Sequence, residues 1–98
     1  MSAQRNEECR QDVLSWLAER PSLKFRADYI HTSLKRKGHD YTDKEVLWAG
    51  EFLSDFPVAL QEGGKEYPLV EWAFETPFSS MKCFGITPHG QLYAERNS

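Results

Sequence analysis

The sequence predicts a small α+β domain in which three helices precede a β-hairpin and a short C-terminal helix or turn. Apolar residues recur at helical spacing in the first half of the chain and alternate with polar residues in much of the second half. A chain of 98 residues, 40% of them hydrophobic, can bury one core, so residues 1–98 are expected to form a single domain. Residues 1–5 are expected to be a loose tail.

The first two helices are expected near residues 6–20 and 27–37. Asn6 is a suitable N-cap, and Arg20 ends the first helix because the proline that follows it disfavours helical backbone. Gly38 is placed to adopt the left-handed conformation that closes the second helix. The positions expected to face the core are Cys9, Val13, Trp16 and Leu17 in the first helix and Ala27, Ile30 and Leu34 in the second.

A third helix is predicted from Thr42 to Asp55, because Thr42-Asp43-Lys44-Glu45 matches the capping-box pattern. Its buried side is expected to contain Val46, Ala49, Gly50, Leu53 and Phe56, and its outer side Lys44, Trp48, Glu51 and Asp55. A tryptophan gains free energy when it is buried, so an exposed Trp48 needs a reason. Trp48 is therefore either part of a binding surface or covered by a loop or by the N-terminal tail.

The remaining segments are predicted to be short strands. Residues 23–26 and 58–61 are strand candidates, and Gly63-Gly64 is expected to form a hairpin turn. The alternation of Val70, Trp72 and Phe74 with polar or small residues predicts a half-buried strand, which pairs with a return strand at residues 81–86. Thr87 followed by a proline predicts the start of a last helix or turn.

No catalytic, metal or cofactor site is predicted. Gly63-Gly64-Lys65 fails the phosphate-loop pattern, because Ala59 and Glu66 stand where a glycine and a hydroxyl residue are required. The carboxylates form no recognisable acid–base pair. The histidines and cysteines lack metal-ligand spacing; they are His31, His39, His89, Cys9 and Cys83. We therefore expect a protein that is not an enzyme.

Two cysteines are too few for a secreted disulfide scaffold, so Cys9 and Cys83 are expected to be reduced thiols in a cytoplasmic protein. The apolar runs are too short for a transmembrane helix, so no membrane partner is expected.

Charge is distributed unevenly along the chain. The net charge of −3 argues against nucleic-acid binding, but residues 20–44 carry seven basic and three acidic residues. This segment has a net charge of +4, against −7 for the rest of the chain. Such an asymmetry predicts a positive face on an acidic body. The alternative is that the run Lys35-Arg36-Lys37 only caps a helix and is solvated.

The order of these segments resembles a winged helix-turn-helix. The resemblance covers residues 9–93 and is carried by the end of the second helix at Leu34 and Gly38, by Tyr41-Thr42-Asp43-Lys44-Glu45-Val46, and by Leu53. The ending Ile86-Thr87-Pro88-His89-Gly90 is similar to that of many small winged-helix regulators. The resemblance implies a transcriptional regulator that binds duplex DNA, with the third helix in the major groove and the hairpin as the wing.

The resemblance also implies which residues would meet the DNA. Bases or a partner would be contacted by Thr42, Lys44, Glu45, Trp48 and Glu51. Phosphates would be contacted by Arg26, Lys35, Arg36, Lys37 and Lys44. The third helix departs from the usual pattern, because a reading helix normally offers Arg, Lys, Asn or Gln to the bases, whereas this helix offers one lysine, a tryptophan and several acids.

Two hypotheses follow. In the first, the chain is a small DNA-binding regulator, and a homodimer is expected because paired half-sites add specificity, with Leu92 and Tyr93 as candidate contacts. In the second, it is a protein-interaction module that binds a partner through Trp48 without binding DNA, since tryptophan is enriched at binding hot spots.

Overall fold

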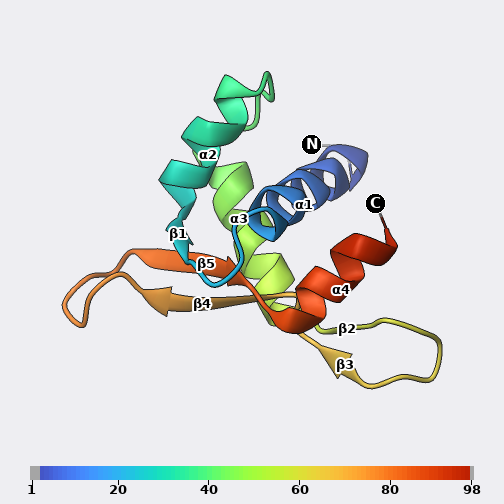
Figure 1. Ribbon diagram of the computed structural model, residues 1–98. Helices are drawn as coiled ribbons and strands as arrows, with labels where there is room; N and C mark the ends of the chain where they lie inside the picture. Colours follow the sequence, from blue (N-terminus) through green and yellow to red (C-terminus); the bar gives the residue numbers. More distant parts are fainter. Residues whose placement is uncertain (1–2, 98) are drawn as a thin grey trace.

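The computed structural model describes residues 3–97 and confirms the α+β class (Figure 1). The elements in chain order are α1 (Ala3–Ala18), β1 (Phe25–Arg26), α2 (Ala27–Arg36), α3 (Asp43–Asp55), β2 (Val58–Ala59), β3 (Glu66–Tyr67), β4 (Val70–Phe74), β5 (Lys82–Ile86) and α4 (Pro88–Arg96). Three helices precede the β4–β5 hairpin, as predicted. No helix within the described residues is long and apolar enough to cross a membrane.

The start of α1 differs from the prediction. A loose tail was expected at residues 1–5 and an N-cap at Asn6, but Ala3–Arg5 already belong to the helix. Met1 and Ser2 lie outside the described residues. The side chain of Arg5 reaches Glu45 at the start of α3, and this long-range contact stabilises the first turn. Hydrophobic periodicity could not reveal it, because the contact is polar and joins residues far apart in sequence.

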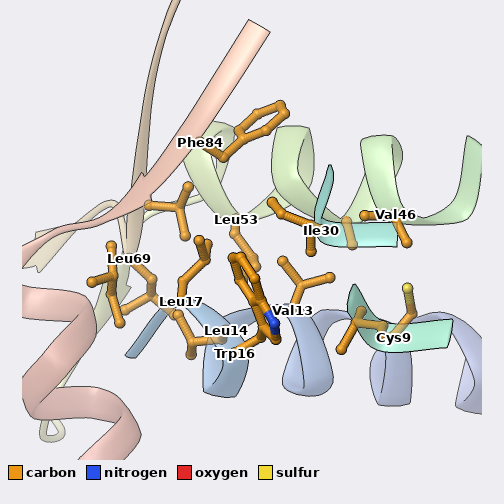
Figure 2. Packing of buried hydrophobic residues seen from close by; sticks show 14 of the residues in the cluster. Cys9, Val13, Leu14, Trp16, Leu17, Ile30, Val46, Leu53, Leu69 and Phe84 are labelled. Atoms are coloured by element: carbon orange, nitrogen blue, oxygen red, sulfur yellow. The ribbon is translucent and has the colours of Figure 1, made fainter. Parts of the chain in front are cut away.

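The helices enclose a core that the spacing of apolar residues predicted well. Figure 2 shows side chains of α1 and α3 pointing toward one another, with Phe84 of β5 beside α3. Gly50 permits this approach, because a Cβ there would lie 3.0 Å from the Phe84 ring. Each large aliphatic side chain buried here contributes about 1.5–3 kcal/mol. The core contains Cys9, Val13, Leu14, Trp16, Leu17, Ile30, Leu34, Tyr41, Val46, Ala49, Leu53, Leu69, Val70, Phe84 and Ile86.

The main sheet has the order β1-β5-β4 and is antiparallel throughout. Trp72 pairs with Phe84 and Val70 with Ile86, so these residues lie on the inner face that carries the core. The alternation in β4 therefore correctly predicts which side chains point toward the core side of the sheet. The expectation of a half-buried strand that included a buried Trp72 is wrong, because only Val70 of this strand is buried and Trp72 and Phe74 are exposed. The hairpin extends past the helices, which leaves its outer end uncovered (Figure 1).

The second sheet and the last helix follow local signals in the sequence. β2 and β3 pair as an antiparallel hairpin, and Gly63 in its turn has φ 77°, a conformation that favours glycine. Thr87 caps α4 by accepting a hydrogen bond from the Gly90 N–H at 2.9 Å, and Pro88 occupies the first turn. In α4, Leu92 is exposed whereas Tyr93 packs against the core.

Candidate functional site

The α2–turn–α3 unit is shaped by local capping interactions. Gly38 has φ 99°, and the His39 N–H donates to the Leu34 carbonyl at 3.1 Å, which ends α2 where the sequence predicted. At the start of α3, the Glu45 N–H donates to the Thr42 hydroxyl at 3.1 Å and the Thr42 N–H donates to the Glu45 carboxylate at 2.9 Å. This is the predicted capping box. The turn between the two helices is thus held at both ends.

Glu45 does not face outward, which corrects its assignment as a base or partner contact. Its side chain is buried, and its carboxylate accepts hydrogen bonds from the Arg5 guanidinium at 2.7 and 3.0 Å. Arg5, together with the backbone N–H of Thr42, lowers the pKa of Glu45 to about 2. Thr42 is exposed, but its hydroxyl is likewise engaged in the capping box. Both residues hold the helix start and are poorly placed to contact a ligand.

Three predicted phosphate contacts are unpaired cations at the two ends of this turn. Lys35 and Arg36 close α2, and Lys44 lies in the first turn of α3. All three are exposed, and none forms an ion pair or side-chain hydrogen bond with any residue from 3 to 97. Lys37 is exposed too, although its Nζ lies 3.6 Å from a carboxylate oxygen of Glu19. A surface pair of this kind is weak.

The Arg26 guanidinium already has carboxylate partners within the chain. Arg26 precedes α2 and forms hydrogen bonds with the carboxylate of Asp28 and, at 3.5 Å, with that of Glu75 at the end of β4. These neighbours raise the pKa of Arg26, while Arg26 lowers the pKa of Asp28. An incoming phosphate would have to displace two carboxylates. Arg26 also lines an open groove of about 840 Å³ between α2 and the hairpin, whose other walls include Tyr29 and Phe74.

The outer face of α3 is aromatic and acidic. Trp48 is 52% exposed, so the alternative that a loop or tail covers it is wrong for the described chain. Glu51 is paired with Lys82 of β5 at 3.1 Å, and that ammonium group lies 4.5 Å from the centre of the Trp72 ring. Glu51 therefore joins α3 to the hairpin. Lys44 is the only cation that α3 itself contributes to this face, and Trp48 is its largest apolar side chain.

An aromatic ridge on α3 was only partly predicted. Phe56 was expected in the core but is 56% exposed, and Phe52 is exposed as well. Trp48 and Phe52 are spaced i, i+4 on one ridge of α3. Phe56, the residue that caps the end of the helix, extends this ridge, with its ring centre 4.5 Å from that of Phe52. The Arg10 guanidinium lies 4.2 Å from the centre of the Phe52 ring. The spacing could have indicated the ridge, but Phe56 also fits the edge of the buried stripe, and only the packing separates these possibilities.

The thiols and histidines are dispersed. Cys9 is a free, buried thiol whose pKa burial raises to about 12, and Cys83 is a free thiol that is partly exposed on β5. Within residues 3–97, no three His, Cys, Asp or Glu side chains gather closely enough to hold a metal ion. The Nδ1 atom of His31 lies 2.7 Å from a carboxylate oxygen of Asp43, and this contact connects α2 with the first turn of α3. Of these groups, His31 therefore helps to hold the two helices on either side of the turn.

The comparisons with known proteins add no family to this description. No protein-family model, no curated protein and no solved structure matches the chain.

Proposed function

We propose that this chain is a winged-helix domain that binds duplex DNA. The order of its elements supports the proposal: a helix, a short strand, two helices joined by a tight turn, and an antiparallel hairpin that returns beside the first strand. The observation that carries the DNA proposal is the group of unpaired cations Lys35, Arg36 and Lys44 around the α2–α3 turn. Free cations on neighbouring helix ends suit phosphate oxygens, because no internal ion pair must be broken first.

Binding is expected to depend mainly on phosphate contacts. The α3 face offers one lysine, and Glu51 is held by Lys82, so few groups are available to read base edges. Three phosphate contacts would release about three counterions, and log affinity should fall against log salt with a slope of about −3. The domain is therefore expected to bind random-sequence duplex at low salt and to release it as the salt concentration rises.

The test is a titration of labelled random-sequence duplex by fluorescence anisotropy at several salt concentrations. Lys44→Gln should make the slope shallower by about 0.9, and replacing Lys35, Arg36 and Lys44 together by Gln should nearly abolish binding. Lys65→Gln is the matched control, because Lys65 is an exposed lysine in the distant β2–β3 turn. Failure to bind at low salt, or equal effects of Lys44→Gln and Lys65→Gln, would refute the proposal.

A second candidate function is recognition of a protein through the α3 ridge. The observation that favours it is the exposure of Trp48 and Phe52 on α3 and of Phe56 at its C-terminal end, which together form an apolar strip. Iodide quenching of Trp48 with and without duplex separates the two candidates. Protection by duplex would place DNA on α3, whereas an unchanged quenching constant together with undetectable DNA binding would favour a protein partner.

A further inference from the structure

Strand β4 ends the main sheet with one free edge. In the order β1-β5-β4, its other side has no paired strand among the described residues (Figure 1). The Glu75 N–H donates to the Met81 carbonyl at 2.9 Å, and the Thr87 N–H donates to the Leu69 carbonyl at 3.1 Å. Antiparallel pairs exchange hydrogen bonds at alternate residues, so the backbone of Trp72 and Phe74 points to the free edge. Such an edge is a template for another strand.

The accessible part of this edge is apolar on its inner face. Residues 71–74 are all exposed, whereas Val70 is fully buried. Trp72 and Phe74 lie on the same face as the core, with their ring centres 5.1 Å apart, and Phe74 is 51% exposed. A second strand along this edge would therefore gain both backbone hydrogen bonds and aromatic contacts.

The sequence of the edge is symmetric about one residue. Glu71-Trp72-Ala73-Phe74-Glu75 reads as acid, aromatic, small, aromatic, acid in both directions. An antiparallel pair of identical strands matches such a pattern with itself. We propose that two copies of this chain associate through β4, as an antiparallel dimer whose two-fold axis passes beside Ala73.

The neighbouring structure selects this register. An axis at Trp72 would place Phe74 of the second copy against the buried Val70, where there is no room. An axis at Phe74 would pair Trp72 with Thr76 of the second copy, beyond the end of the strand. With the axis at Ala73, Trp72 of each copy lies opposite Phe74 of the other, and two alanines meet at the centre. Each interaction is made twice, as in other two-fold dimers.

The charges flanking this pair are balanced within each copy. The register brings Glu71 opposite Glu75 of the second copy, and like charges in opposite positions are unfavourable. Glu71 lies 3.4 Å from the Lys24 ammonium, and Glu75 lies 3.5 Å from the Arg26 guanidinium. The cations therefore offset part of the repulsion. The contact is short, which predicts a weak, concentration-dependent dimer.

This dimer is independent of the proposed DNA contacts, because it uses none of Lys35, Arg36 or Lys44. It also differs from a dimer through α4, for which Leu92 offers an exposed apolar side chain and Tyr93 does not.

The first test is sedimentation equilibrium of the full chain over a wide range of concentrations. Phe74→Lys should raise the dissociation constant at least about tenfold, since lysine on an edge strand opposes pairing. Phe56→Lys is the matched control, because Phe56 is exposed to a similar extent but lies at the C-terminal end of α3, outside the sheet. Circular dichroism verifies that both variants are folded. A chain that stays monomeric at millimolar concentration, or equal weakening by the two variants, overturns the proposal.

The second test fixes the register by cross-linking. In a Cys83→Ser background, which removes the thiol paired with Ala73 across β4 and β5, Ala73→Cys should oxidise rapidly to a disulfide-linked dimer. Glu71→Cys should not, because the two copies of residue 71 would be about 14 Å apart along the strands. Equal cross-linking of both variants, or faster cross-linking through residue 71, would contradict the Ala73 axis.

Discussion

Arg5 and Glu45 join the start of α1 to the start of α3 through two hydrogen bonds of 2.7 and 3.0 Å. The same carboxylate accepts from the Thr42 N–H, so one buried acid caps a helix and anchors a second one. Arg5 also donates to the Asp40 carbonyl at 3.1 Å, in the turn that precedes α3. The position of the proposed DNA-binding turn therefore depends on a residue near the N-terminus.

The ionisation of Glu45 should make stability depend on pH. Its pKa is about 2 in the folded protein against 4.5 ordinarily, so its contribution is fully present above about pH 5 and is lost as pH falls toward 2. Glu45→Gln should lower the free energy of unfolding by about 1–3 kcal/mol near neutral pH, with the difference from the parent shrinking in acid. Urea unfolding across this pH range measures the difference in free energy of unfolding. Glu62→Gln is the control, because Glu62 is exposed. A difference that stays constant down to pH 2 would contradict this role.

Gly90 should not tolerate alanine, although it lies in α4. A Cβ there would come 2.0 Å from the Leu69 carbonyl oxygen, which belongs to the chain just before β4. Helix propensity alone favours alanine over glycine by about 1 kcal/mol, but the clash should reverse the sign and destabilise by about 2–3 kcal/mol. The melting temperature of Gly90→Ala decides whether the clash outweighs helix propensity. Gln91→Ala in the same helix is the control. A stabilised Gly90→Ala would show that α4 sits farther from β4.

The tryptophans should differ in their accessibility to solvent. Trp16 is buried, whereas Trp48 is on the open face of α3. Trp48→Phe should lower the iodide quenching constant and shift the remaining emission to shorter wavelength, while Trp16→Phe should raise the average quenching constant. If the emission lost with Trp48 proves to be the shielded part, α3 is covered in solution and both candidate functions lose their surface.

The thiols should react in a fixed order. Cys9 is buried, its Sγ lies 3.6 Å from the Glu45 carbonyl oxygen, and burial raises its pKa to about 12. Cys83 is only partly buried, although burial raises its pKa too. At pH 8 a disulfide reagent should modify Cys83 first and reach Cys9 only on unfolding. Cys83→Ser should therefore leave almost no reactive thiol in the folded protein, and rapid reaction of that variant would rule out a buried Cys9.

Local features of the sequence were sufficient to predict most element boundaries. Thr42 with Glu45, Gly38, and Thr87 with its following proline act on backbone groups within a few residues, so their effect is nearly independent of the rest of the fold. The spacing of apolar residues likewise identified most of the core of α1, α2 and α3, because a helix must bury one continuous face.

The sequence alone could not determine which polar residues of the candidate site are free. From the sequence, Arg26 and Lys44 are equivalent candidates for a phosphate contact. In the structure, however, Arg26 is bound by two carboxylates, one at the start of α2 and one at the end of β4. Glu45 matched both a capping box and an outward contact, and Arg5, forty residues away in sequence, decided between them.

The exposure of the aromatic residues was also decided by the tertiary structure. Trp72 and Phe74 have the alternation of a buried strand, and Phe56 lies at the edge of a buried helical stripe. All three are exposed because the helices cover only part of the hairpin and of α3. Periodicity determines the direction in which a side chain points, whereas burial requires that another element extend far enough to cover it, and that depends on the packing of the whole chain.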